Sequence, residues 1–265
     1  MGSKLPLRFV ALGYLALLLA FPVGLVLYRT FEHGLAAPIN SLTSADGAHA
    51  FWLTLEIAAI AVAVNTVFGV VMALLLVRGR FPGKALLSGL IDLPLAVSPV
   101  VVGLALLLVY GRTGWFGTWL ADHGIRVIFS TPGMVLATIF VSLPFVVRET
   151  VPVLEELGTE QEQAASTLGA SSWQTFWRVT LPAIRWGVGY GVVLTTARAL
   201  GEFGAVSVVS GRLVGQTETL TLRVQNEFER FDLTGAYAAS ALLAVMAIAV
   251  LLVMTALEKR RSRVS

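Results

Sequence analysis

The sequence has no cysteine, only three histidines and few charged residues, which make up 13% of its 265 positions. Without cysteine, neither a disulfide framework nor a thiolate metal site can form. His33, His49 and His123 fall in predicted outer loops and lack the paired spacing of metal ligands, so we interpret them as surface residues. The sequence contains no nucleophile elbow and no pair of catalytic carboxylates. We therefore expect neither an enzyme nor a bound cofactor in this chain.

The glycine-rich segment 79–85 does not have the spacing of a nucleotide-binding loop. Three residues separate Gly79 from Gly83, where a phosphate-binding loop has four. Ala85 occupies the position at which a serine or threonine would reach magnesium. We interpret this segment as a basic turn between two helices.

Long apolar stretches dominate the chain instead, since 56% of the residues are hydrophobic and the mean hydropathy is +0.81. A helix needs about 20 mainly apolar residues to cross a bilayer, and lipid offers no hydrogen-bond partner to an open strand. We predict an all-α membrane protein with six transmembrane helices, of which only the fifth carries charge, on Arg198 and Glu202. The predicted spans are Phe9–Tyr28, Ile57–Val77, Leu93–Gly111, Val127–Val147, Trp186–Gly211 and Leu233–Leu257.

The basic residues between these spans predict the orientation of the chain. Twelve of them fall on one face of the membrane and six on the other, and the more basic face is normally cytoplasmic. Both termini and the segment between spans four and five are therefore predicted in the cytoplasm. The pI near 9.5 follows from this topology and does not indicate a nucleic-acid partner. The twelve are Lys4, Arg8, Arg78, Arg80, Lys84, Arg148, Arg178, Arg185, Lys259, Arg260, Arg261 and Arg263.

The polar segment Thr159–Pro182 carries two helix-start patterns. Thr159 with Glu162 reads T-x-x-E and Ser171 with Gln174 reads S-x-x-Q, and each pattern is typical of a capping box. Gly169 lies where the first helix must end, because glycine adopts a left-handed conformation without steric cost. We predict two short helices joined by a sharp elbow, a protrusion suited to docking.

The two predicted helices present different faces. Ala164, Ala165 and Leu168 form a small apolar face that suits a groove on another protein better than lipid. The second helix places an aromatic stripe at helical spacing, which fits either docking or the lipid interface. The stripe consists of Trp173, Phe176, Trp177 and Thr180.

This segment resembles the cytoplasmic EAA loop of binding-protein-dependent ABC import permeases, through residues 163–170 and 179–182. The resemblance implies a type I importer permease fold, and coupling helices that sit in a cleft of an ATPase subunit. It also departs from the family pattern, because Gln163 stands where the family usually has glutamate, with Glu162 one residue earlier. The resemblance implies that the residues that couple to the ATPase are Glu162, Gln163, Ala164, Ala165, Leu168, Gly169 and Ala170.

Residues 91–103, 110–117 and 197–211 are similar to the W-type permease subunits of sulfate/thiosulfate importers. Part of the last segment is shared with molybdate permeases, so a molybdate, tungstate or other oxyanion importer stays open. The resemblance implies an ABC ATPase dimer that binds ATP and magnesium, a second homologous permease, and an extracytoplasmic sulfate-binding protein. A bacterial inner-membrane location follows. A secondary transporter and a membrane-embedded enzyme are the alternatives from other classes, and neither an inverted repeat nor clustered catalytic residues support them.

We divide the chain into a first helix with its outer loop (1–50), a permease core (51–258) with a coupling loop (155–182), and a basic cytoplasmic tail (259–265). Arg198, Glu202 and Ser207 are candidates for the translocation path or gate. Arg198 and Glu202 are also spaced as a neutralising i, i+4 pair, and both interpretations stay open. Gly187 and Gly191 predict a close helix contact. The outer loop 212–232 is either a solvated connector or a docking surface for the binding protein.

Overall fold

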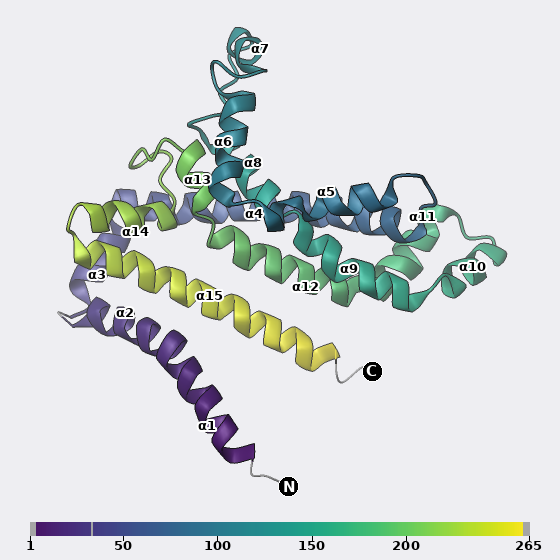
Figure 1. The fold of residues 1–265 in the computed structure, drawn as a ribbon, viewed down its shortest axis with the longest axis horizontal. Helices are drawn as coiled ribbons and strands as arrows, with labels where there is room; N and C mark the ends of the chain where they lie inside the picture. Colours follow the sequence, from purple (N-terminus) through teal and green to yellow (C-terminus); the bar gives the residue numbers. More distant parts are fainter. Residues whose placement is uncertain (1–3, 33, 262–265) are drawn as a thin grey trace.

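The computed structural model describes residues 4–32 and 34–261, and every regular element within those ranges is a helix (Figure 1). Residues 262–265 of the predicted basic tail, Arg263 among them, and His33 lie outside the described residues. In chain order the elements are α1 (Lys4–Leu15), η1 (Ala16–Ala20), α2 (Phe21–Phe31), α3 (Ala36–Thr43), α4 (Ala45–Arg78), α5 (Lys84–Ala96), α6 (Pro99–Tyr110), α7 (Gly117–Asp122), α8 (Thr131–Ser142), α9 (Pro144–Leu157), α10 (Glu160–Thr167), α11 (Ser172–Thr175), η2 (Phe176–Thr180), α12 (Leu181–Leu200), α13 (Gly204–Val209), α14 (Leu220–Glu229) and α15 (Leu233–Arg261).

Four helices in the described part are long and apolar enough to cross a membrane, and a bent pair raises the number to five. The four are Arg8–Phe31, Ala45–Arg78, Thr131–Leu157 and Leu233–Leu257. The predicted count of six is therefore not confirmed.

The predicted third span is broken. Helices α5 and α6 meet at 110°, so Leu93–Gly111 is not one straight helix. The residue before a proline is restricted to extended backbone, and Ser98, which precedes Pro99, has φ −59° and ψ 134°. In Figure 1, α6 leaves the bundle at this break and carries α7 away from it. Val102 of α6 packs in one cluster with Leu53 and Ile57, which lie in the N-terminal half of α4.

The predicted fifth span is also divided. α12 ends at Leu200, and α13 begins at Gly204 after a short non-helical connection. At its other end, α12 continues without a break into η2 and α11, because Phe176 and Leu181 both keep right-handed helical backbone. The second of the two predicted short helices is therefore one end of a long helix with a π-helical turn, and the prediction of a separate short helix is wrong.

Helices α4, α9 and α12 form the centre of the bundle, where small residues permit close contact. A Cβ atom on Gly69 of α4 would lie 2.5 Å from Val146 Cβ, and one on Gly191 of α12 would lie 2.6 Å from Val146 Cα. A Cβ on Gly187 would lie 2.8 Å from the carbonyl oxygen of Glu149. The close contact predicted at Gly187 and Gly191 is confirmed. α15 and α2 pack at the edge of the bundle, where Thr30 Oγ1 donates to the Tyr237 carbonyl at 3.1 Å (Figure 1).

Candidate functional site

The elbow between α10 and α11 has the predicted backbone geometry. Gly169 is left-handed, with φ +84°. The Gly169 amide donates to the Ser166 carbonyl at 3.0 Å and the Ala170 amide donates to the Ala165 carbonyl at 3.0 Å. These two bonds are the pair that defines a Schellman termination, which satisfies carbonyls that a helix end would leave unpaired. The elbow is therefore a defined turn and not a loose connection.

Only one of the two predicted capping boxes forms. Ser171 Oγ accepts from the Gln174 amide, and the Gln174 side chain accepts from the Ser171 amide, so this box is confirmed. Thr159 makes no side-chain bond to the backbone of α10, so the first box is wrong. Its hydroxyl instead accepts from Gln163 Nε2 at 2.9 Å. The Glu162 side chain, which the box would need, is used elsewhere.

Glu162 and its partner Arg78 join four helices at the end of the bundle where α4 terminates. Its Oε2 lies 3.0 Å from Arg78 Nε at the end of α4, and its Oε1 accepts from Thr180 Oγ1 at 2.9 Å at the end of η2. The same arginine donates to the backbone carbonyls of Leu154 in α9 and of Gly158. The carboxylate predicted to contact an ATPase is therefore engaged inside the chain. Sequence reasoning missed this network, because Arg78 and Glu162 are 84 positions apart and have no local spacing that would link them.

The outer surface of the elbow is free in this chain. Leu168 is 89% exposed and Trp173 is 70% exposed. Gln163, Ala164 and Gly169 are also exposed, while Ala165 and Ala170 are half-buried. The predicted aromatic stripe splits: Trp173 and Trp177 face outward, Phe176 packs against the core cluster that contains Leu154 and Ile184, and Thr180 is buried. The part left for a partner is thus small, apolar and concentrated around Leu168 and Trp173.

Arg198 and Glu202 form the ion pair that their spacing predicts. Arg198 Nη2 lies 2.7 Å from Glu202 Oε2, and the Glu202 side chain is 2% exposed. Glu202 has a second role that its spacing does not predict. Its Oε1 accepts from the Ala205 amide at 2.8 Å, so it supplies an acceptor to the first turn of α13. The hydroxyl of Thr221 donates to the Glu202 carbonyl at 2.8 Å and ties the outer loop to this junction.

Ser207, the third candidate for the path, lies on α13 and is half-buried. Its hydroxyl donates to the Gly204 carbonyl at 2.8 Å, and its own carbonyl accepts from Arg212 Nε at 3.4 Å. These bonds hold α13 to the segment that follows it. A path role for Ser207, Arg198 and Glu202 stays a prediction.

Several charges of the outer loop 212–232 are used within the chain. Arg223 is 7% exposed and lies 3.4 Å from Glu218 and 3.0 Å from Glu227. The carboxylate of Asp232 accepts from the Gly235 amide at 3.0 Å at the start of α15. The loop is therefore an ordered structure that includes α14, and these residues are not free charges on a docking surface.

The chain matches the sequence model of the family "Binding-protein-dependent transport system inner membrane component" over residues 65–263. It is 51% identical to "Sulfate transport system permease protein CysW" of Synechocystis sp., over 95% of this chain and 91% of that protein. It is 39% identical to "Sulfate transport system permease protein CysT" of Escherichia coli, over 96% of this chain and 90% of that protein.

Among solved structures, a bacterial alginate ABC transporter, determined in complex with an alginate pentasaccharide-bound periplasmic protein, contains a chain of similar fold. The TM-score is 0.75 at 16% sequence identity, with 93% of this chain and 90% of that chain covered. This likeness supports the fold of an ABC importer permease and says nothing of the substrate.

Proposed function

Because this chain belongs to the family of binding-protein-dependent transport system inner membrane components, we propose that it is the permease subunit of an ATP-driven importer of sulfate or thiosulfate. The substrate assignment rests on the 51% identity to a sulfate transport permease along almost the whole chain. A molybdate or tungstate permease is the second candidate, because residues 198–205 are shared with that group.

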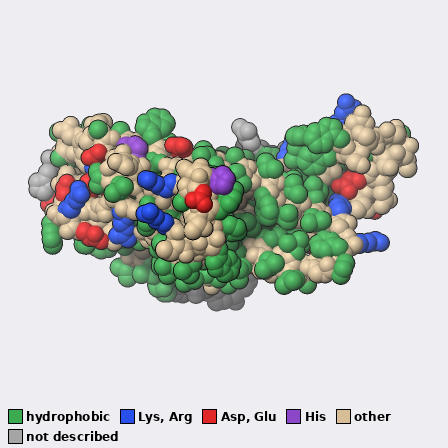
Figure 2. Space-filling view, turned by 90° about the horizontal axis from the view of Figure 1, so that it is seen from above, with side chains coloured by type: hydrophobic (Ala, Val, Ile, Leu, Met, Phe, Trp, Pro, Cys, Tyr) green, Lys and Arg blue, Asp and Glu red, His purple; other side chains and the backbone are tan. Residues whose placement is uncertain are grey.

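The proposed assembly contains a second permease of similar fold, an ATPase dimer and an extracytoplasmic binding protein. The 39% identity to a T-type sulfate permease over 96% of this chain supports a heterodimer of related permeases. ATP and magnesium belong to the ATPase subunits, and this chain contributes half of the translocation path. The distribution of basic residues supports a cytoplasmic location for the elbow and both termini. Figure 2 shows hydrophobic side chains over the middle of the molecule and charged side chains mainly toward its ends, which fits a chain that spans a membrane.

Coupling in this proposal starts at the elbow surface around Leu168 and Trp173, which sits in the ATPase. A displacement of α10 is passed on through the Glu162 carboxylate, because that group contacts Arg78 of α4 and Thr180 of η2 at the same time. Two long central helices, α4 and α12, then move with the ATPase. A lone permease has no nucleotide machinery, so transport requires the complete assembly.

Uptake of isotope-labelled sulfate and labelled molybdate in a strain that lacks this gene, with and without the gene restored, tests the proposed function. We expect restored uptake of sulfate and inhibition of that uptake by thiosulfate. Restored uptake of molybdate alone would assign the second candidate. Purification should yield the chain together with an ATPase and a second permease, and ATP hydrolysis by the single purified chain would contradict the assembly.

A further inference from the structure

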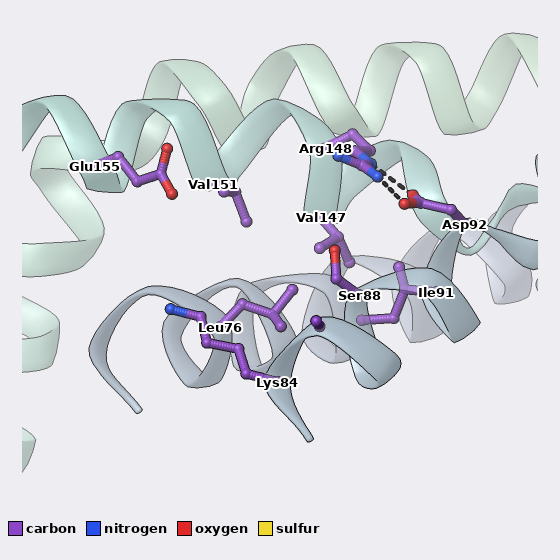
Figure 3. A pocket seen from close by; sticks show the side chains of 10 residues that line it. Leu76, Lys84, Ser88, Ile91, Asp92, Val147, Arg148, Val151 and Glu155 are labelled. Carbon is purple, nitrogen blue, oxygen red and sulfur yellow. Dashed lines mark hydrogen bonds and ion pairs between the residues drawn. The ribbon is translucent and has the colours of Figure 1, made fainter. Parts of the chain in front are cut away.

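A cavity of about 410 Å³ lies between α4, α5 and α9 at the end of the bundle where α4 terminates (Figure 3). Its size is within the range of ligand pockets, about 300–1,000 Å³. Five of the ten lining residues are apolar, four are charged and one is a serine. The lining residues are Leu76, Lys84, Ala85, Ser88, Ile91, Asp92, Val147, Arg148, Val151 and Glu155.

Two of the four charges neutralise each other at one end of the cavity. Arg148 Nε donates to Asp92 Oδ1 at 2.5 Å, and Arg148 Nη2 also contacts Asp92 Oδ2, so the guanidinium and the carboxylate meet side by side. Figure 3 shows this pair joining α9 to α5. In a two-point contact of this kind, N–H groups of the guanidinium meet both carboxylate oxygens, so much of the hydrogen-bonding capacity of the two groups is used. It closes one end of the cavity and leaves no net charge there.

The other two charges have opposite signs and no partner among the described residues. Lys84 is the first residue of α5, Glu155 lies near the end of α9, and both are exposed. In Figure 3 the Lys84 ammonium and the Glu155 carboxylate lie across the opening from each other, away from the Arg148–Asp92 pair. Ser88 is four residues after Lys84, on the same face of α5, and its hydroxyl points toward Val147 in Figure 3, where it adds a donor to the cavity wall.

From this arrangement we propose that the cavity binds the headgroup of phosphatidylethanolamine in the cytoplasmic leaflet. The lipid phosphate lies against Lys84 and Ser88, and the lipid ammonium lies against Glu155. The apolar walls formed by Leu76, Ile91 and Val151 take the start of the acyl chains. The site follows from the charges and from the predicted orientation of the chain, and it does not depend on which oxyanion is transported.

The chemistry of the lining selects this headgroup over its common alternatives. A choline headgroup carries no N–H donor, and proteins recognise it with aromatic rings, which none of the ten lining residues provides. An anionic headgroup would favour an excess of basic residues, as in the basic pockets that bind cardiolipin. Here Lys84 and Arg148 are balanced by Asp92 and Glu155. A zwitterion with a hydrogen-bonding amine complements the two remaining charges.

Native mass spectrometry of the full chain tests the proposal, after exchange through nanodiscs that contain phosphatidylethanolamine, phosphatidylcholine and phosphatidylglycerol in equal amounts. We expect phosphatidylethanolamine to be retained above its share. In Lys84→Gln and in Glu155→Gln its retention should fall about threefold, the size expected for one solvent-accessible ion pair. Arg80→Gln and Glu156→Gln are matched controls, because each removes a neighbouring charge that does not line the cavity, and they should retain it fully.

Three outcomes would overturn the proposal. Equal retention of phosphatidylcholine would remove the role of the amine, and preferential retention of phosphatidylglycerol would assign an anionic site. The third is unchanged retention of phosphatidylethanolamine in Lys84→Gln and in Glu155→Gln, which would show that neither charge contacts the headgroup.

Discussion

Glu162 and Glu202 lie near opposite ends of the helical segment formed by η2 and α12, and each carboxylate is paired with an arginine. Glu202 pairs with Arg198, which lies four residues earlier in the sequence, and the Glu202 side chain is 2% exposed. Glu162 pairs with Arg78, which is 84 positions away, and both side chains are about one-quarter exposed. By their predicted sides of the membrane we call Arg198–Glu202 the outer pair and Arg78–Glu162 the cytoplasmic pair. The outer pair is local and its carboxylate is buried while Arg198 is 31% exposed, whereas the cytoplasmic pair is long-range and both of its side chains are partly open to water.

This difference indicates two different roles. A local pair neutralises charge inside the membrane, where a lone ion would cost several kcal/mol, and it moves with its own helix. A long-range pair holds separate helices in register, because breaking it frees α10 from α4 and η2. We therefore expect the cytoplasmic pair to transmit motion between helices and the outer pair to neutralise charge within its own segment. The predictions below test this distinction.

Gly169→Val should have the largest effect and abolish uptake. A β-carbon in the left-handed region costs about 1 kcal/mol and a branched one costs more, so the elbow would adopt another backbone conformation. No atom lies within 4 Å of the added Cβ position, so the effect comes from the backbone and not from packing. Uptake and membrane content are measured together, and membrane insertion should be unchanged.

Gly169→Asn is the control for the elbow, since asparagine enters the left-handed region more readily than other residues with a side chain. It should recover much of the uptake. Full transport by Gly169→Val would show that this turn has no part in coupling.

Glu162→Ala should reduce uptake about fivefold to tenfold while the assembled complex still hydrolyses ATP. A hydrogen bond to a charged group contributes about 1.5–3 kcal/mol, and partial exposure of this pair lowers that value toward 1 kcal/mol. Arg78→Ala should have a similar effect, and the double variant should be little worse than either single one, because the three changes remove one network. The measurement is the ratio of sulfate transported to ATP hydrolysed.

Glu160→Ala is the matched control, since this glutamate is exposed on the first turn of the same helix. An equal loss of uptake in Glu160→Ala would show that the effect comes from removing a negative charge from α10 and not from breaking the contact with Arg78. Additive losses in Glu162→Ala and Arg78→Ala would contradict a shared network.

The outer pair should respond more weakly. Arg198→Leu leaves Glu202 with its bond to the Ala205 amide, whereas Glu202→Leu leaves both Arg198 and that amide without the carboxylate, so the second variant should be expressed less. Glu202→Gln keeps an oxygen acceptor and should fall between the native chain and Glu202→Leu. Membrane content is measured for each variant.

The double variant Arg198→Leu with Glu202→Leu separates pairing from a path role. We expect a membrane content above that of Glu202→Leu, because no arginine is left unpaired although the Ala205 amide still lacks its acceptor. A path role predicts reduced sulfate uptake, because the two charges would assist the anion. Normal uptake in the double variant would reject a path role for both residues.

Local patterns in the sequence predicted local structure well. Gly169 and the Ser171–Gln174 box are confirmed, and so is the ion pair at Arg198 and Glu202, since each depends on residues within a few positions of one another. The class of fold was also predictable, because an apolar stretch of membrane length is a property of contiguous sequence and does not depend on tertiary contacts.

Which distant segments meet could not be predicted: Gly187 and Gly191 indicated a close helix contact, but not that α9 is the helix they contact. The Arg78–Glu162 pair joins helices whose packing the sequence does not state, and it also explains why the Thr159 capping box failed. The 110° break between α5 and α6 lies directly before Pro99, but a proline in an apolar stretch is equally compatible with a mild kink. α6 also packs against α8 and α13, and the local sequence does not state these contacts.

Gln163→Glu should have the smallest effect, even though it restores the residue that the family usually carries at this position. Gln163 is exposed and its only described side-chain bond is to Thr159 Oγ1, within the same turn. A bond of this kind contributes a few tenths of a kcal/mol, so uptake should stay within about twofold of the native chain. Glu162 already supplies the carboxylate that orders α10, and a second one beside it adds no new contact to Arg78. Uptake is measured with Gln163→Ala alongside, which should be equally mild. A severalfold gain in uptake by Gln163→Glu would instead show that the ATPase binds a carboxylate at this position, and that the native chain makes a weaker, neutral contact there.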